Sequence, residues 1–574
     1  MKVSTTRVAD EIVRFLVKFC SPKVFLLTGN GAMYLNDAMQ IHPEIQYVCV
    51  RNESVAPVAA SAYSQISGKV GTVCVTAGPG AANAMPGVVE AWVDGVNIFV
   101  LSGQVPYTEM KNYEPNSRTF GIAGLPIVDY VQTFTKLAIC LNDSEELENV
   151  LEKILTSLMF DRPGPIWLDI PLDIQSAECR VIDLDSLAKK VKSKNIIKKV
   201  PKPLEFESEI FTDAFSSSKR PLFVIGTGSK KVIQNRSLIK WLEDSKAVFA
   251  LTRPMACEVS LDFPGNMGVI GVRGRPWSKE ILLKSDLIIG LGSRLPTSIV
   301  GPNYSYINES SQILLVNSNN SEIIRHKKRI INQSAISVED FINNLEILDA
   351  IKLNNEISIW QLEAIQIKHK KRIIHKTERA KPLNIYWFCE NLEKRLLSQH
   401  VVTSDAGSNY YACGQAMTFI KGNRELTSGT FAAMGISIPL AIGGSVALAN
   451  KSRILCITGD GSIELNVQEL QTISNYKFNI AIFVINNGGY ASMRAWQDTF
   501  FNSRYIGSTD DTGTRPMNFE KLASAFDIEY LRISNSKDFD DKIESVINAS
   551  NPILIEVICD PNQVLELPMS IDIV

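Results

Sequence analysis

The sequence predicts an α/β protein with three consecutive domains, each built around a parallel sheet. The chain has 574 residues, far too many for one hydrophobic core. Short apolar runs recur along it, and each is followed by a Gly-rich or polar turn and then a helical stretch. That alternation is typical of parallel α/β sheets. We expect the domains at 1–175, 205–345 and 381–560.

Each predicted domain contains four short apolar runs that are expected to be buried strands. In the first domain they are Val24–Leu27, Tyr47–Val50, Gly71–Thr76 and Ile98–Leu101. In the second they are Leu222–Ile225, Ala247–Leu251, Leu287–Leu291 and Ile313–Val316. In the third they are Val401–Thr403, Ile454–Thr458, Ile480–Ile485 and Ile553–Val557.

Two basic segments separate these domains. Residues 176–205 are polar and Lys-rich, so we expect a linker there. Residues 350–380 are also basic, and we interpret them as a solvated connecting helix. A phosphate- or partner-binding patch is the less favoured interpretation, because acidic residues elsewhere balance the charge.

Composition excludes several function classes. The formal net charge is −2, from 59 basic and 61 acidic residues, which argues against a nucleic-acid partner. No apolar run reaches the ~18 residues of a membrane span, so we expect no membrane segment. The ten cysteines have no zinc-ligand spacing and the N-terminus lacks the apolar core of a signal peptide. A cytoplasmic protein with reduced thiols is expected.

Polar clusters follow two of the expected strands in the third domain. The first is Gly459-Asp460-Gly461-Ser462, and the second is 486–489, Asn-Asn-Gly-Gly. In an open parallel sheet both clusters lie at the edge where ligands bind. The glycines let backbone N–H groups approach a phosphate. The Asp460 carboxylate, the Asn487 amide and the Gly489 carbonyl offer the hard oxygen ligands that Mg²⁺ prefers.

The spacing of the two clusters resembles the signature of thiamine-diphosphate enzymes. Twenty-four residues separate Gly-Asp-Gly from Asn-Asn. The chain resembles the acetolactate synthase / pyruvate oxidase branch of these enzymes along nearly its whole length. The pattern NNxGYxSxRxxQxxFF is more similar to synthase-like proteins associated with surface-sugar biosynthesis. The resemblance implies a pyrimidine-binding domain, a central Rossmann-like domain and a diphosphate- and Mg²⁺-binding domain, with Asp460, Asn487 and the Gly489 carbonyl as metal ligands.

The first domain carries an independent part of the resemblance, in VRNESVAPVAASAYSQISGKVGTVCVTAGPGAAN. Glu53 matches the glutamate that hydrogen-bonds N1′ of the cofactor's aminopyrimidine and so activates N4′ as a local base. A plain surface position is the alternative, disfavoured because Glu53 follows an apolar strand and precedes an Ala-rich helix. Gly31 matches a glycine of the cofactor cleft. The same resemblance assigns cofactor contacts to Thr76, Pro79 and Asn83.

The third domain adds the segment TSGTFAAMGISIPLAIGG. Met434 matches the apolar residue that props the cofactor into its bent shape, and a plain core methionine is the alternative. Asp405, Gly407 and Ser408 match the strand-end loop that touches the diphosphate. The other cofactor-binding positions implied by the resemblance are Ala432, Gly459, Gly461, Ser462 and Tyr490.

The sequence also departs from acetolactate synthases. Ala123 and Gly124 stand where the family carries Gln-Glu facing the substrate, and Asn52-Glu53-Ser54 replaces His-Glu-Gln. The resemblance places Met493 and Trp496 with Ala123 in the substrate pocket. Arg494 has two equally favoured interpretations, a contact to a substrate carboxylate or phosphate and a structural ion pair. Residues 294–298, Arg-Leu-Pro-Thr-Ser, replace an Arg-rich loop, so we expect no functional FAD.

The resemblance implies a reaction and an assembly. The expected enzyme decarboxylates a 2-oxo acid, with pyruvate as the first candidate, and transfers the acyl-anion unit to a carbonyl acceptor. The expected assembly is a homodimer or homotetramer in which Glu53 and Asp460 of different chains serve one cofactor. Two alternatives remain open: a lyase or hydrolase acting on a cyclic or sugar diketone, and a non-catalytic cofactor-binding homologue.

Overall fold

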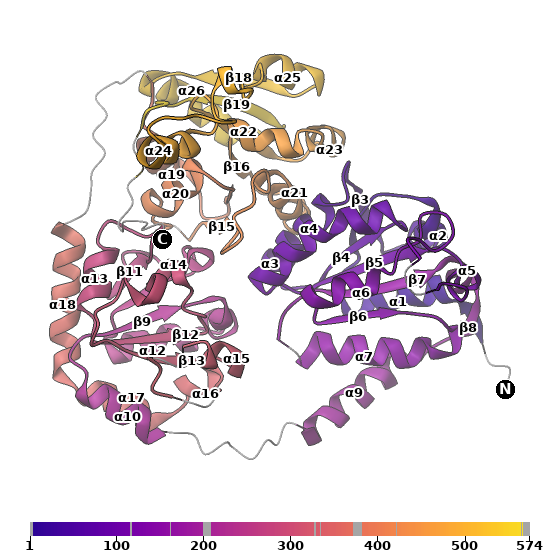
Figure 1. Cartoon of the computed structure of the whole chain (residues 1–574), viewed down its shortest axis with the longest axis horizontal. Helices are drawn as coiled ribbons and strands as arrows, with labels where there is room; N and C mark the ends of the chain where they lie inside the picture. The colour runs from indigo at the N-terminus through magenta and orange to yellow at the C-terminus, as the bar shows by residue number, and fades with distance from the viewer. Residues whose placement is uncertain are drawn as a thin grey trace.

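The chain folds into three α/β domains, each with one parallel sheet between helices (Figure 1). The computed structural model describes residues 4–114, 117–160, 162–198, 208–326, 329–332, 335–370, 382–420, 422–563 and 565. The predicted fold class is confirmed. Within these residues, no helix combines the length and the apolar character needed to cross a membrane.

The N-terminal domain is built on a six-stranded sheet of order β3-β2-β4-β5-β7-β6. Its strands are β2 (Lys23–Leu26), β3 (Gln46–Cys49), β4 (Gly71–Val75), β5 (Ile98–Gln104), β6 (Leu137–Cys140) and β7 (Ile166–Pro171). The short strands β1 (Thr5–Arg7) and β8 (Glu178–Arg180) pair antiparallel beside it. Its helices are α1 (Val8–Phe19), α2 (Met33–Ile41), α3 (Val55–Ser67), α4 (Pro79–Asp94), α5 (Tyr107–Met110), α6 (Ile127–Val131), α7 (Leu147–Phe160), α8 (Leu172–Ser176) and α9 (Leu184–Lys198).

The central domain has a five-stranded parallel sheet of order β11-β10-β9-β12-β13. Its strands are β9 (Pro221–Ile225), β10 (Phe249–Leu251), β11 (Asn266–Val269), β12 (Leu287–Leu291) and β13 (Gln312–Val316). Its helices are α10 (Ser208–Ser217), α11 (Lys230–Gln234), α12 (Ser237–Ser245), α13 (Ser278–Lys284), α14 (Thr297–Val300), α15 (Asn320–Ile324), α16 (Val338–Ile342), α17 (Leu345–Leu353) and α18 (Asn355–Lys370).

The C-terminal domain has a six-stranded parallel sheet of order β15-β14-β16-β17-β19-β18. Its strands are β14 (Val401–Ser404), β15 (Arg424–Leu426), β16 (Ile454–Gly459), β17 (Ile480–Asn486), β18 (Glu529–Ile533) and β19 (Ile553–Ile558). Its helices are α19 (Ile385–Arg395), α20 (Ser408–Ala416), α21 (Ser437–Ala447), α22 (Asp460–Ile463), α23 (Glu469–Tyr476), α24 (Ala491–Phe501), α25 (Phe519–Ala525) and α26 (Ser536–Asn548).

The first and last sheets repeat one topology, because both follow the order 2-1-3-4-6-5 when their strands are numbered along the chain. In the last sheet the chain leaves β14 toward β15 on one side and returns to β16 on the other. The chain thus switches direction between β14 and β16, and the region beyond the carboxyl ends of such strands is the usual ligand position in open sheets. We refer to this region as the crevice. Residues 405–408 follow β14, and residues 459–462 are the end of β16 and the start of α22, so both segments lie at this position.

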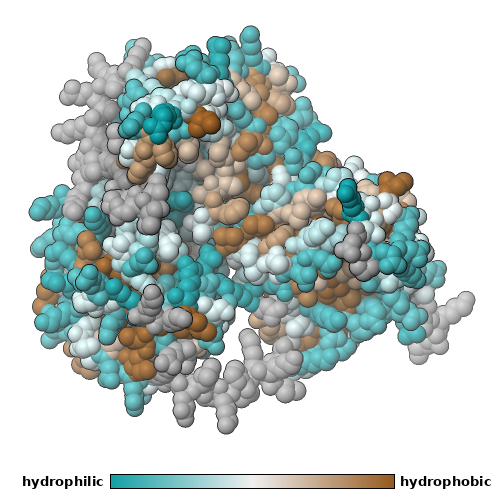
Figure 2. Space-filling model, in the orientation of Figure 1, coloured by the Kyte–Doolittle hydropathy of each residue, from teal (hydrophilic) through white to brown (hydrophobic). Residues whose placement is uncertain are grey.

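The N-terminal and C-terminal domains pack together through α3 and α21. The two helices approach closely at Gly443, where a Cβ would overlap the Ala59 carbonyl oxygen. Apolar residues of both helices join one buried cluster. The face shown in Figure 2 has brown and tan surface gathered where these two domains meet, with teal surface prevailing at the outer rims.

The central domain is held to the C-terminal domain by buried arginines. Arg253 forms a bidentate ion pair with Glu425, and both side chains are almost fully buried. The guanidinium of Arg253 also lies 4.8 Å from the ring centre of Tyr410 on α20. Arg275 donates to the carbonyls of Gln415 and Met417 near the end of the same helix.

Each expected strand is present, with its ends within two residues of those observed except for β5, which continues three residues beyond the expected Leu101. The expected linker at 176–205 is wrong over most of its length, because it contains β8 and the 15-residue helix α9. Leu184, Leu187 and Val191 are buried, so α9 packs on the domain despite its lysines. The expected connecting helix appears as α18, but it is not solvated all round, because it buries Ile357, Trp360, Ala364 and Ile367. Residues 371–380 of that basic segment, and residues 199–205 of the expected linker, lie outside the described residues.

Candidate active site

The two polar clusters of the third domain meet at the carboxyl ends of adjacent strands, β16 and β17. Asp460 begins α22 directly after β16 and is only 3% exposed. Its Oδ2 accepts hydrogen bonds from the backbone N–H of Asn487 at 3.1 Å and of Gly489 at 2.7 Å. Its Oδ1 accepts from the Gly461 N–H at 2.8 Å. The carboxylate therefore ties both clusters together.

Burial and hydrogen bonding act in opposite directions on Asp460. Desolvation raises the pKa of its carboxyl, while the N–H donors of Gly489, Gly461 and Asn487 favour the ionised form. The positive charge of Arg494 acts in the same direction as these donors. A cation bound at the carboxylate would also favour the charged form.

The loop after β17 has an unusual backbone that presents it to β16. Gly488, Gly489 and Tyr490 all have positive φ, at 81°, 77° and 41°. Two glycines permit this conformation at little cost. The ring of Tyr490 then packs onto Gly461, where a Cβ would lie 2.9 Å from the ring. The two loops are in direct contact, as the sequence predicted for one ligand site.

Asp405, at the end of β14, is saturated by donors of its own domain. It is fully buried, and it accepts hydrogen bonds from Asn409, Thr458, Ser437 and the Gly435 N–H, at 2.8 to 3.2 Å. Burial raises its pKa to about 6 against these bonds. Its side chain fixes neighbouring elements, while Gly407 (φ 82°) and Ser408 begin α20 at the crevice.

The Met434 segment is shaped by two residues with positive φ, Ala432 at 50° and Gly435 at 78°. The Ala432 N–H donates to Ser428 Oγ at 2.7 Å, and Asn466 donates to the Gly435 carbonyl at 2.9 Å. Met434 itself is half-buried. Its loop contacts the start of the Asp460 region, because a Cβ on Gly435 would lie 2.9 Å from the Ser462 carbonyl.

The predicted residues of the N-terminal domain cluster at the matching edge of its own sheet. Glu53 is half-buried, and its Oε2 accepts from the Asn83 side chain at 3.2 Å. Thr76 Oγ1 accepts from the Gly31 N–H at 2.9 Å. Pro79 is the first residue of α4, and Asn83 lies at the start of its second turn. A Cβ on Gly80 would lie 2.7 Å from the Thr76 side chain and 3.3 Å from Glu53 Oε1, so Glu53 and Gly31 belong to one cluster.

The loop containing Ala123 lies against this cluster. It is closed by two hydrogen bonds between the backbones of Phe120 and Gly124, both 3.0 Å. Ala123 has a φ of 64°, and its carbonyl occupies the space that a Cβ on Gly78 would need. No polar side chain extends from position 123, and the Ala123 residue is exposed.

The two clusters belong to domains that touch within one chain. The Arg51 N–H donates to Glu469 of α23 at 2.8 Å, and the Cys49 N–H donates to Tyr476 at 2.9 Å. Within the described residues, no hydrogen bond joins Glu53 to Asp460 or Asn487. The arrangement of Glu53 and Asp460 around a single cofactor, from two chains, stays a prediction.

Helix α24 carries the remaining predicted residues. Trp496 stacks on Phe500 with ring centres 5.3 Å apart, and Met493 is 49% exposed. The hydrogen bonds of Arg494 go to backbone carbonyls, a set of partners that the sequence did not predict. No ion pair joins Arg494 to a carboxylate among the described residues, and a contact to a substrate stays a prediction.

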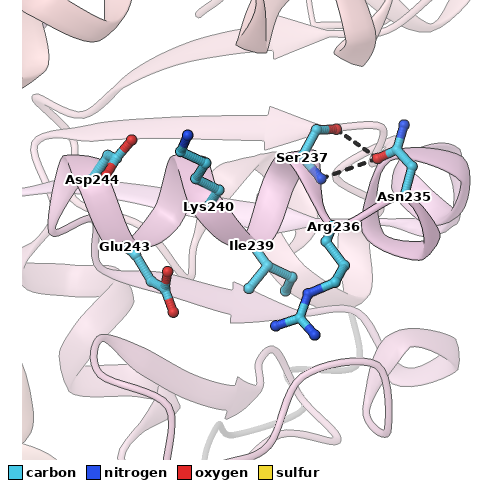
Figure 3. Close-up of a pocket in the computed structure, with 7 residues that line it drawn as sticks. All are labelled: Asn235, Arg236, Ser237, Ile239, Lys240, Glu243 and Asp244. Atoms are coloured by element: carbon cyan, nitrogen blue, oxygen red, sulfur yellow. Dashed lines mark hydrogen bonds between the residues drawn. The ribbon is translucent and has the colours of Figure 1, made fainter.

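A separate hollow of about 480 Å³ lies on the central domain along α12 (Figure 3). It contains none of the predicted site residues. Its lining residues are Asn235, Arg236, Ser237, Ile239, Lys240, Glu243 and Asp244.

The chemistry of the donors at β16 and β17 fits a magnesium ion. Asp460 offers a carboxylate oxygen, Asn487 an amide oxygen and Gly489 a backbone carbonyl, all hard ligands. Asn487 is only 9% exposed, so the donors are largely withdrawn from solvent. No group of three or more His, Cys, Asp and Glu side chains with metal-binding arrangement occurs in the described part of the chain, which excludes there a cage of acidic side chains.

Comparison with known families agrees with this geometry. The N-terminal TPP binding domain of thiamine pyrophosphate enzymes matches residues 6–125. The central domain of the same enzymes matches residues 209–343. The C-terminal TPP binding domain matches residues 405–557. The three matches follow one another in family order, one for each structural domain.

Curated relatives match along nearly the whole chain. The acetolactate synthase large subunit of Cyanidium caldarium is 27% identical, covering 96% of this chain and 92% of the relative. The acetolactate synthase isozyme 2 large subunit of Escherichia coli (strain K12) is 26% identical, covering 94% and 92%. The acetolactate synthase large subunit of Lactococcus lactis is 26% identical, covering 95% and 91%. The chain therefore belongs to the thiamine pyrophosphate enzymes and is acetolactate-synthase-like within them.

Proposed function

We propose that this chain is a thiamine-diphosphate- and Mg²⁺-dependent carboligase that decarboxylates a 2-oxo acid, with pyruvate as the first candidate. The second substrate is a carbonyl acceptor. The observation that carries the proposal is the contact between Asp460 and the loop of Asn487 and Gly489, at the crevice edge of a sheet in a matched TPP-binding domain.

In this proposal Asp460, Asn487 and the Gly489 carbonyl hold Mg²⁺ against the diphosphate. The thiazolium ring of the bound cofactor supplies the electron sink that makes loss of CO₂ from a 2-oxo acid feasible. Glu53 holds a proton at N1′ of the aminopyrimidine, and its bond from Asn83 keeps the carboxylate oriented. Met434 supports the cofactor from the loop between Ala432 and Gly435, whose backbone is fixed by Ser428 and Asn466.

The binding arm of the test is calorimetry with thiamine diphosphate and Mg²⁺. Asp460→Ala is expected to abolish Mg²⁺-dependent binding, because it removes the charged ligand and the link between both loops. Glu53→Gln is expected to keep binding and to slow proton exchange at the cofactor's C2 strongly. Wild-type protein that binds no cofactor would overturn the proposal.

The reaction arm separates three outcomes. Release of CO₂ from pyruvate, enhanced by an added carbonyl acceptor, supports the carboligase. Cofactor binding without CO₂ release, but with cleavage of a cyclic or sugar diketone, supports the lyase or hydrolase instead. The short Ala123 side chain favours that second candidate, because no polar group extends toward a small acceptor there. Cofactor binding with no turnover on either set indicates a non-catalytic homologue.

We also propose a homodimer or homotetramer in which Glu53 and Asp460 of different chains complete one site. Co-expression of Glu53→Gln with Asp460→Ala tests this directly. Mixed dimers would contain one site with both native residues, so random pairing should restore about a quarter of wild-type activity. A site completed within one chain would show no restoration, and a monomer that turns over on sedimentation would also contradict the proposal.

A further inference from the structure

The loop 487–489 lies between two opposite charges. On one side, Asp460 accepts from the N–H groups of Asn487 and Gly489. On the other, Arg494 donates to the carbonyls of Asn487 at 2.8 Å, Gly488 at 2.9 Å and Gly489. Charge-assisted hydrogen bonds are shorter and stronger than neutral ones, and bonds in series polarise each other. The N–H groups of this loop are thus held by Asp460 and its carbonyl groups by Arg494.

The local backbone explains how Arg494 reaches these carbonyls. Gly488, Gly489 and Tyr490, all with positive φ, immediately precede α24. Arg494 lies in the first turn of that helix, so its side chain extends back over the loop. The same guanidinium donates to the carbonyls of Ser508 at 3.3 Å and Pro561 at 3.2 Å. It therefore joins the loop to two further segments.

A fixed positive charge beside a proposed dication is unfavourable by itself, since like charges repel. Arg494 must therefore contribute through geometry if the site binds metal. A carbonyl oxygen has two lone pairs, so the Arg494 bond to Gly489 leaves one for a metal ion. The planar guanidinium donates in a fixed fork, which suits it to holding several acceptors at set angles.

We propose that Arg494 is a positioning residue of the metal site: it holds the carbonyls of residues 487–489 so that the Gly489 oxygen is oriented for Mg²⁺. This inference rests on the proposed function, because it assumes Mg²⁺ at Asp460, Asn487 and Gly489. Loss of a group that orients a metal ligand typically weakens metal binding by about 10- to 100-fold.

The test is a calorimetric titration of metal into protein saturated with thiamine diphosphate. Arg494→Met is expected to weaken Mg²⁺ binding by about tenfold or more. Ca²⁺ binding should weaken less, because Mg²⁺ demands near-ideal octahedral geometry and Ca²⁺ tolerates irregular sites. A loss of charge alone would change the affinity of both dications alike, in the direction of tighter binding.

Two further variants complete the design. Arg494→Lys keeps the charge but places all its donors on one nitrogen. We therefore expect it to bind Mg²⁺ more weakly than the wild type and to favour Mg²⁺ over Ca²⁺ less. Arg515→Met removes an equal charge from an 85% exposed side chain of a nearby loop, and should leave both affinities unchanged. Melting midpoints of all variants establish that they fold.

The outcomes separate the inference from the function it rests on. Wild-type protein that binds no Mg²⁺ with thiamine diphosphate would overturn the proposed function and this inference together. A wild type that binds Mg²⁺, with Arg494→Met or Arg494→Lys binding it equally or more tightly, would overturn the positioning role alone. Equal weakening for Mg²⁺ and Ca²⁺ would also contradict it.

Discussion

Asp405 and Asp460 end neighbouring strands of one sheet, but their carboxyls have different surroundings. Four donors from its own domain saturate Asp405, whereas Asp460 receives three backbone N–H groups of the two ligand loops. The sequence motif predicted that both acids belong to the crevice. It could not predict which one is saturated, because Ser437 and Thr458 reach Asp405 only after the sheet has formed.

Arg494 illustrates the same limit from the other side. A positive residue five positions after Gly489 could equally have met a carboxylate, a phosphate or solvent. Its carbonyl partners depend on the positive φ angles of three consecutive residues, 488–490. In the sequence, only the glycines at 488 and 489 indicated such a backbone. The Asp460–Asn487 pair was predictable because the strand ends fix both positions with few intervening degrees of freedom.

The stability of the fold should depend on pH through Glu90. This residue is only 5% exposed and lies on α4, where that helix meets the loop of Ser428. Burial raises its pKa to about 7, and nearby Asp94 adds to this, while Ser428 opposes it. Asp94, whose own pKa is raised to about 6, bonds to the Gly429 N–H and faces Lys230 and Arg294. The protonated form of Glu90 is thus favoured in the fold.

Because the folded pKa lies above the unfolded value, Glu90 lowers stability as pH rises from about 4.3 to about 7. Glu90→Gln should therefore raise the melting midpoint at pH 8 and leave it nearly unchanged at pH 4, below the unfolded pKa. The expected gain at pH 8 is on the order of 3 kcal/mol. Scanning calorimetry at both pH values measures it. An equal shift at both would show that the carboxyl's ionisation is not the cause.

At the scale of single elements, apolar runs predicted most of the inner strands of the three parallel sheets but only two of their six edge strands, β3 and β13. β6, β11, β15 and β18 lie at or near sheet edges and were not predicted; β7, a buried inner strand, was also missed. Short edge strands carry weaker apolar patterns than strands buried on both faces. Helix α9 was missed for another reason: its lysines masked the apolar spacing of Leu184, Leu187 and Val191, which bury against the domain.

The crossing of α3 and α21 gives a prediction about one element pair. Gly443→Ala places a Cβ against the Ala59 carbonyl, so the helices must separate. Such overpacking typically costs about 1–3 kcal/mol. The neighbouring Gly444 is the matched control, because its nearest atom to a new Cβ, on Ile454, lies at 3.5 Å.

Thermal melts and limited proteolysis distinguish the two variants. Gly443→Ala should lower the melting midpoint and increase the rate of proteolytic cleavage. Gly444→Ala should be neutral or gain up to about 1 kcal/mol from helix propensity. The same behaviour in both variants would mean that the α3–α21 contact does not hold the domains together.

At the scale of the whole molecule, two of the three sheets share one strand order, and loops at equivalent strand ends carry the predicted residues. Gly31 and Thr76 follow β2 and β4, as Asp405 and Asp460 follow β14 and β16. The sequence predicted three α/β domains from length and alternation. It did not predict how they dock, because docking depends on buried side chains such as Arg253 that look like ordinary surface charges in a sequence.

The docking of the central and C-terminal domains should depend strongly on the ion pair of Arg253 and Glu425. Both side chains are nearly fully buried, and Ser404 also donates to Glu425 at 2.9 Å. Removing one partner leaves a buried charge uncompensated, which typically costs about 3–5 kcal/mol. Arg253→Met and Glu425→Gln should each shift urea unfolding to lower denaturant.

The double variant decides whether the pair acts as a unit. Arg253→Met with Glu425→Gln removes both charges, so its cost should be well below the sum of the two single costs. Tyr410 connects this ion pair to the candidate active site. Arg253 lies over the Tyr410 ring, and Tyr410 belongs to α20, the helix that begins at Ser408 beside the crevice. Each single variant should therefore also weaken thiamine diphosphate binding, and the double variant should regain part of it. If the losses of the two single variants simply add in the double variant, both in urea unfolding and in thiamine diphosphate binding, the two residues stabilise their domains independently. Domain docking would then have no effect on the loop expected to bind the diphosphate.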